Sequence, residues 1–237
     1  MKSYSQNNQD NLVLEYLNNK TQGFFLDIGC CYPKTINNTY LLEKEFGWDG
    51  ISIDIHDFVE PNGETWTDLR KSKQIIEDAL KIDYSDLLRK LNAPKEIDFL
   101  SMDLEPPDLT YECLKKIPFD EYTFNVILFE IDDEREPNFE TRKKESRELI
   151  QSKGYIFLGN IGGQDDFYIN NSLNTDNNNV NFFDSLIRIG IPESTINHHQ
   201  TPDFKIVNIQ NNMVAALVEC TECNLTYRGN HGYSQNS

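Results

Sequence analysis

Short apolar runs alternate with amphipathic stretches over the first 170 residues of the chain. Six runs carry Ile, Phe and Leu at successive positions, a pattern typical of parallel strands that are covered on both faces. These predicted strands are Phe24–Ile28, Gly50–Ile55, Gln74–Ala79, Ile97–Leu104, Thr123–Ile131 and Tyr155–Asn160. The predicted helices between and around them are Gln9–Asn19, Asn37–Phe46, Ser85–Leu91, Leu109–Lys116 and Asn138–Ser152.

This repeated order of strand and helix predicts an α/β fold, a Rossmann-like doubly wound sheet of about seven strands with right-handed crossovers. Gly162 and Gly163 then turn Tyr155–Asn160 towards Phe167–Asn170 over a short loop. We expect an antiparallel hairpin at the end of the sheet for that reason.

Residues 171–237 are expected to form a C-terminal extension to a domain of residues 1–170. The Asn-rich stretch Asn170–Asn179 is typical of a loop or linker, and Val180–Ile189 is compatible with a helix. The pattern predicts a second hairpin from Phe204–Ile209 and Met213–Glu219. The polar end of the chain, from about Leu225, is expected to fray.

The excess of acidic over basic residues disfavours some classes of binding partner. The chain holds 22 Lys and Arg against 39 Asp and Glu, so its formal net charge is −17. Such a surface repels phosphate backbones and anionic lipid, which argues against nucleic-acid and membrane partners. The first residues are polar, and five cysteines, including the adjacent Cys30 and Cys31, do not indicate a disulfide framework. We therefore expect a cytoplasmic protein.

Candidate chemistry lies where the first two strands end. Asp27 precedes Gly29, which permits a tight turn and close approach of a ligand to the backbone. The second strand ends near Asp54, and an acid at that point can accept hydrogen bonds from both hydroxyls of a ribose. The fingerprint G-x-G-x-x-G is missing, which disfavours a nicotinamide or flavin oxidoreductase and favours S-adenosylmethionine. The alternative is that Asp27 and Gly29 merely shape a turn.

Four ordered segments resemble one known family. The segments SYSQNNQD, GFFLDIGCCYPKTINNTYLLE, ISIDI and IDFLSMDLEPPDL are similar to those of the FkbM-type S-adenosylmethionine-dependent methyltransferases. The resemblance covers roughly residues 3 to 170. It implies a sheet of the class I methyltransferase type, and O-methyl transfer to a hydroxyl of a small polar acceptor. The family favours a sugar acceptor, on a glycan or linked to a nucleotide.

The resemblance also assigns positions in this sequence to the cofactor. The opening segment, with Gln6, would fold over the cofactor, and Asp54 with the following Ile55 would meet the ribose. The other positions are Asp27, Gly29 and Cys30 in the first turn, Asn38 at the next helix start, Asp78 and Ala79 near adenine, and Asp103 with Glu105 in the fourth-strand motif.

Two departures from the family pattern affect these assignments. Tyr32-Pro33 replaces an Asp-Gly, and Pro106 replaces a Gly. Proline at position 33 fixes φ and removes a donor, so the loop would contact the methionine moiety differently. A catalytically inactive binding module with the same fold is therefore the alternative function.

Methyl transfer to a hydroxyl requires a base, or a metal ion that acidifies the hydroxyl. Asp103, Glu105 and Asp132 follow strands at the presumed active edge, and His56 follows the ribose acid. Asp103, Asp132 and Asp133 could also supply hard oxygen ligands for Mg²⁺. The alternative is that such acids cap helices. The C-terminal extension would cover the acceptor side or form a homodimer contact.

Overall fold

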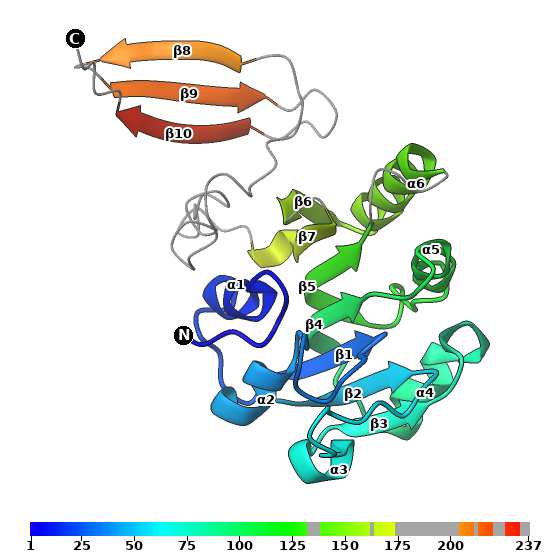
Figure 1. Cartoon of the computed structure of the whole chain (residues 1–237). Helices are drawn as coiled ribbons and strands as arrows, with labels where there is room; N and C mark the ends of the chain where they lie inside the picture. The colour runs from blue at the N-terminus through cyan, green and yellow to red at the C-terminus, as the bar shows by residue number, and fades with distance from the viewer. Residues whose placement is uncertain (132–137, 162–163, 174–203, 211–212, 220–225, 233–237) are drawn as a thin grey trace.

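A seven-stranded mixed sheet forms the centre of the computed structural model (Figure 1), with strand order β3-β2-β1-β4-β5-β7-β6. The structure describes residues 1–131, 138–161, 164–173, 204–210, 213–219 and 226–232. The strands of this sheet are β1 (Phe24–Ile28), β2 (Asp49–Asp54), β3 (Lys73–Ile76), β4 (Glu96–Met102), β5 (Thr123–Glu130), β6 (Tyr155–Ile161) and β7 (Asp165–Asn170).

The first five strands run parallel, and β7 pairs antiparallel with both β5 and β6. The expected final hairpin is therefore confirmed, and β7 is inserted between β5 and β6. Parallel strands with crossover helices, and a reversed last strand, give the expected Rossmann-like sheet of the class I methyltransferase type. The predicted fold class is confirmed.

Helices cover both faces of this sheet (Figure 1). The helical elements are α1 (Gln9–Tyr16), α2 (Tyr40–Phe46), α3 (Trp66–Leu69), η1 (Ala79–Lys81), α4 (Tyr84–Lys90), α5 (Asp108–Leu114), α6 (Phe139–Ser152) and η2 (Asn171–Leu173). The sequence patterns did not predict α3 or η1, because each spans at most four residues, too few for a helical period to be visible.

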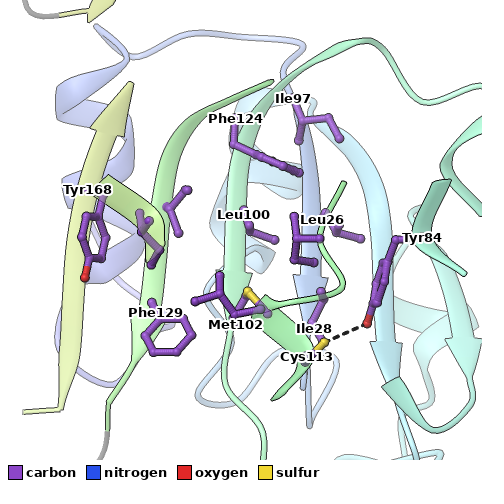
Figure 2. Close-up of a cluster of buried hydrophobic side chains, with 14 of the residues drawn as sticks. Leu26, Ile28, Tyr84, Ile97, Leu100, Met102, Cys113, Phe124, Phe129 and Tyr168 are labelled. Carbon is purple, nitrogen blue, oxygen red and sulfur yellow. Dashed lines mark hydrogen bonds between the residues drawn. The ribbon is translucent and has the colours of Figure 1, made fainter. Parts of the chain in front are cut away.

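Two apolar layers hold the sheet between its helices. One layer joins α4, α5 and α6 to one face, through side chains such as Leu88, Cys113 and Ile150. Figure 2 shows part of it, with Tyr84 Oη 3.1 Å from Cys113 Sγ. The other layer joins α1 and α2 to the opposite face, through residues such as Leu14 and Leu42. The alternating side-chain directions of each strand supply both layers.

Four predicted strands end earlier than expected. The second ends at Asp54 instead of Ile55, and the third at Ile76 instead of Ala79. The fourth ends at Met102 instead of Leu104, and the fifth at Glu130 instead of Ile131. Side-chain bonds end two of them: His56 N donates to Asp54 Oδ1 at 3.0 Å, and Leu104 N donates to Thr110 Oγ1 at 2.9 Å. Local hydrogen bonds between side chains and the backbone compete with the hydrogen bonds that pair neighbouring strands.

A separate antiparallel sheet has the order β10-β9-β8. Its strands are β8 (Phe204–Gln210), β9 (Met213–Glu219) and β10 (Thr226–Gly232). The predicted second hairpin is thus confirmed. The expectation that the chain frays from Leu225 is wrong, because Thr226–Gly232 pairs with β9 along its whole length. The predicted helix Val180–Ile189 lies outside the described residues. No helix in the described part of the chain is long and apolar enough to cross a membrane.

Candidate functional site at the carboxyl edge of the sheet

The turns after β1 and β4 are in backbone contact. Gly29 has φ +84°, and its amide donates to Ile53 O at 2.8 Å. Asp103 N donates to Ile28 O at 2.9 Å, and a Cβ at position 29 would lie 1.6 Å from Asp103 O. Only glycine permits this geometry, since any side chain would overlap the neighbouring carbonyl. The predicted turn is therefore built for close approach of two strand ends.

Buried charges hold the loop after β1. Arg70 ion-pairs with Glu43 at 2.6 Å, with both side chains at most 1% exposed. Its Nη1 donates to Pro33 O and to Asn37 Oδ1, each at 3.0 Å, and its Nη2 donates to Thr39 Oγ1 at 2.9 Å. The carbonyl of the unexpected Pro33 is therefore a specific acceptor in this loop.

Glu60 fixes the same loop from the segment after β2. Its Oε1 accepts from Lys34 N at 2.8 Å and from Thr35 N at 2.9 Å, and its Oε2 accepts from Thr35 Oγ1 at 2.5 Å. Cys31 and Ile36 each have φ 52°, a strained conformation for residues other than glycine. The surrounding bonds thus maintain a loop shape that the local sequence does not favour.

Most backbone amides of this loop already donate within the protein. Gly29 and Cys30 donate to Ile53 O, Cys31 donates to Asp54 Oδ2, and Asn37 donates to Tyr4 O. The backbone amides of Lys34 and Thr35 donate to Glu60. Few amide donors of the loop are therefore left to surround a pyrophosphate. This bonding agrees with the missing glycine fingerprint.

Asp27, near the end of β1, and Cys30, in the turn that follows, are both buried. Asp27 Oδ2 accepts from Thr39 Oγ1 at 2.8 Å. Burial raises the pKa of Asp27 to about 6, against the lowering effects of the Thr39 hydrogen bond and the Arg70 charge. Burial also raises the pKa of the Cys30 thiol well above its usual range. Cys30 therefore packs as a neutral side chain.

Asp54 ends β2 at this edge. Its Oδ2 accepts from Cys31 N at 2.9 Å, and its Oδ1 accepts from His56 N at 3.0 Å. The two amides orient the carboxylate, and each oxygen keeps a further lone pair for a hydroxyl donor. The side chain of His56 is exposed and packs edge-on against Phe58, with ring centroids 5.6 Å apart.

Two apolar side chains are exposed beside Asp54. Ile55 is 59% exposed, and Ile76, whose Cα is the register partner of Asp54 on β3, is 46% exposed. Exposed isoleucines at neighbouring strand ends offer an apolar surface to a flat ring. Ile55 was among the predicted residues, whereas Ile76 was not, since it was placed inside a longer strand.

The two residues predicted to lie near adenine are in the segment after β3. Asp78 caps η1 by accepting from Leu80 N at 3.0 Å, and it ion-pairs with Lys81 at 3.3 Å. Ala79 is buried in the apolar layer against α4 and α5. Their predicted place at the end of a third strand is wrong, because β3 ends at Ile76.

Asn38 lies just before α2, not at its first residue, since the helix begins at Tyr40. Its Nδ2 donates to Ser101 Oγ at 3.1 Å, across to β4. Ser101 is the register partner of Asp27, so Asn38 bridges the first loop to the strand next to β1. This bond brings the predicted start of the helix to the same edge as Gly29 and Asp103.

The predicted acids after β4 differ in exposure. Asp103 is half-buried beside Gly29, and Glu105 is exposed. Asp132 and Asp133 lie outside the described residues, so the magnesium site predicted from Asp103, Asp132 and Asp133 stays a prediction. Among the described residues, no group of three or more His, Cys, Asp or Glu side chains is placed to hold a metal ion.

The N-terminal arm, residues 3–8, is docked by Asp10. Its Oδ1 accepts from Ser3 Oγ at 2.6 Å and Ser5 Oγ at 3.0 Å, and its Oδ2 accepts from Tyr4 N at 2.8 Å. Tyr4 also packs on Tyr40, with ring centroids 4.6 Å apart. The arm therefore lies against the loop after β1, and Gln6 is exposed on it.

Three charged or polar residues of this edge were not singled out from the sequence. Arg70 and Glu60 bind the loop after β1 but lie in segments that carry no recognisable motif. Asp165 lies at the start of β7. Gln9 Nε2 donates to Asp165 Oδ2 at 2.8 Å across 156 positions of sequence. No spacing of residues in the sequence predicts such a contact. The one available signal is the acid pair Asp165-Asp166, directly before the run Phe167–Ile169.

No known family model and no curated protein sequence matches the chain. The solved structures that are similar to it include three that are described as methylases or methyltransferases. One, from Clostridium thermocellum and described as an rRNA methylase, has 12% identity and a TM-score of 0.46, over 72% of this chain and 97% of that one. Another, from Klebsiella pneumoniae and described as an O-methyltransferase, has 13% identity and a TM-score of 0.41, over 71% and 82%.

The third is a prophage-encoded protein of Escherichia coli described as a DNA modification methyltransferase. It has 14% identity and a TM-score of 0.43, and the similarity covers 65% of this chain and 48% of that one. The chain thus spans about half the length of that protein. The strand order and the antiparallel β7 themselves define the class, a Rossmann-like fold of the class I methyltransferase type.

Proposed function

We propose that the chain binds S-adenosylmethionine at the carboxyl edge and transfers its methyl group to a hydroxyl oxygen. The observation that carries the proposal is the position of Asp54, at the end of the strand next to β1. Its carboxylate is oriented by two backbone amides and stands beside the exposed Ile55 and Ile76. A ribose diol fits the carboxylate, and an adenine ring fits the apolar pair.

The charge at this edge also suits the cofactor. Asp27 and Asp103 lie where β1 and β4 end, and the charge of Asp103 contributes to the raised pKa of Asp27, after burial. S-adenosylmethionine carries an ammonium group and a sulfonium, and cations next to such carboxylates relieve their repulsion. A nucleotide with a pyrophosphate would bring further negative charge to a loop with few donors left.

For the acceptor, we propose a small polar molecule that presents a sugar hydroxyl. The support is the FkbM-type resemblance of four ordered segments, together with a net charge of −17 that disfavours polyanionic substrates. Hydroxyl groups are good donors to carboxylates, and this edge is rich in carboxylates. Nucleic acid and membrane surfaces are not proposed as partners.

The test is transfer of a tritium-labelled methyl group from S-adenosylmethionine to a panel of p-nitrophenyl glycosides, with and without Mg²⁺. We expect at least one labelled methyl ether, and loss of the label in Asp54→Ala. Cofactor binding without transfer to any sugar contradicts the proposed acceptor class and favours the inactive binding module. Absence of cofactor binding contradicts the whole proposal. A dependence of transfer on Mg²⁺ would support the magnesium ligands predicted from sequence.

A further inference from the structure

Asp165 is placed at the active edge by the reversed strand. It is the first residue of β7, opposite Glu130 at the end of β5 and Ile161 at the end of β6. Because β7 runs antiparallel to β5, its first residue lies where the parallel strands finish. The charge of Asp103, directly after β4, acts on the Asp165 carboxyl. The two acids therefore belong to the same edge.

The Asp165 carboxylate has little compensation for its burial. The residue is 7% exposed, and in the described part of the chain its one hydrogen-bond donor is the neutral amide of Gln9. The neighbouring Asp166, by contrast, accepts from Arg147 Nε at 2.7 Å and Nη2 at 2.8 Å, and also from Asn160 and Tyr168. A buried carboxylate is normally paired as Asp166 is.

Most other buried acids of the domain are compensated by a cation or by several donors, and Asp27 at the same edge is the exception, with Thr39 Oγ1 as a neutral donor. Glu43 is paired with Arg70, and Asp98 is paired with Lys20 at 2.6 Å. Asp10 has several hydroxyl and amide donors. For Asp165, burial raises the pKa to about 7, with the Gln9 bond opposing and the charges of Asp103 and Asp166 adding to the rise. A carboxylate kept at such a cost to stability suggests a functional role.

Gln9 leaves one oxygen of Asp165 available. Its Oε1 accepts from Asn7 N at 2.6 Å, so its Nε2 is directed to Asp165 Oδ2. The amide therefore fixes the carboxyl group by one oxygen and connects it to the docked N-terminal arm. Within the described residues, Asp165 Oδ1 accepts no hydrogen bond.

We propose that Asp165 is a catalytic residue, the base that accepts the proton of the acceptor hydroxyl, with Gln9 as its positioning residue. This inference rests on the proposed function. As the hydroxyl oxygen forms its bond to the methyl carbon, the C–S bond breaks and its electron pair stays on sulfur. The proton passes from that oxygen to Asp165 Oδ1. The products are a methyl ether, S-adenosylhomocysteine and a neutral Asp165 carboxyl.

The experiment compares Asp165→Asn with two matched variants. Asp120→Asn removes an 89% exposed carboxylate, and Asp166→Asn removes the buried carboxylate paired with Arg147. Three quantities are measured at pH 8: the urea midpoint of unfolding, the Kd for S-adenosylhomocysteine, and methyl transfer to the best glycoside of the panel. Asp165→Glu is included because it restores a carboxylate one methylene further from the backbone.

We expect Asp165→Asn to unfold at higher urea than the wild type and to bind S-adenosylhomocysteine with unchanged Kd. Its kcat should fall by about 100-fold or more, the usual contribution of a general base, and Asp165→Glu should recover part of it. Asp166→Asn should unfold at lower urea, and Asp120→Asn should match the wild type.

Two results overturn the inference. One is full transfer activity in Asp165→Asn. The other is an Asp165→Asn variant that loses stability as Asp166→Asn does, which would make the carboxylate structural. Failure of the proposed function itself looks different, since the wild-type protein would then bind no S-adenosylhomocysteine or transfer no methyl group.

Discussion

Replacing Arg70 by Met should destabilise the protein more than any surface ion-pair variant. The guanidinium lies 4.6 Å from the Trp66 ring and donates to Glu43, Pro33 O, Asn37 and Thr39. Methionine fills a similar volume but leaves the Glu43 carboxylate buried without its cation. Breaking a buried pair from one side costs about 3–5 kcal/mol of the free energy of unfolding.

The assay is urea unfolding followed by far-ultraviolet circular dichroism at pH 7. Arg89→Met is the control, because Arg89 is 72% exposed where it pairs with Asp86, and such pairs contribute little. The double variant Glu43→Gln/Arg70→Met should recover part of the loss, since it removes the unpaired charge. Unfolding of Arg70→Met at the same urea concentration as Arg89→Met would contradict a stabilising role of the buried pair.

Three further results are expected. The free energy of unfolding of Asp165→Asn should exceed that of the wild type by about 4 kcal/mol at pH 8 and equal it near pH 4. A carboxyl whose folded pKa is raised from 3.8 to about 7 costs stability only once the pH exceeds its unfolded pKa, so the same difference between the two proteins at both pH values would contradict this. Gly29→Ala should not accumulate as folded protein, because its Cβ would lie 1.6 Å from Asp103 O. A native circular dichroism spectrum of this variant would contradict the close contact between the two turns. Asp10→Ala should release the N-terminal arm, so that limited proteolysis cleaves within residues 3–8 at least tenfold faster than in the wild type, and unchanged cleavage would contradict the docking.

The sheet could be predicted from sequence because its strands are apolar on both faces. The run FFLDI appears in the structure as Phe24–Ile28, residue for residue, and the final hairpin was readable from the glycine pair after Asn160. Strand ends were less predictable, since His56 N and Leu104 N bond to nearby side chains in preference to the ladder. The strand β10 was missed because its residues are polar.

The residues of the candidate site also differ in how well the sequence predicts them. Asp27 and Asp54 lie at the ends of strands, and Gly29 and Asp103 follow strands directly, so their position at one edge could be inferred from the order of elements. The residues that hold the loop after β1 could not. Arg70 contacts atoms at 27 to 37 positions earlier in the sequence, and Gln9 contacts Asp165 across 156 positions. Such contacts arise from tertiary packing and leave no periodic signal.

The most direct test of the account is calorimetric titration with S-adenosylhomocysteine of the wild type, Asp54→Ala and the exposed control Asp120→Ala. The account predicts micromolar binding to the wild type and to Asp120→Ala. It also predicts at least tenfold weaker binding to Asp54→Ala, because two ribose hydroxyls lose their acceptor. Equal binding by all three proteins would contradict the placement of the ribose at Asp54. Absence of binding to the wild type would contradict the methyltransferase function itself.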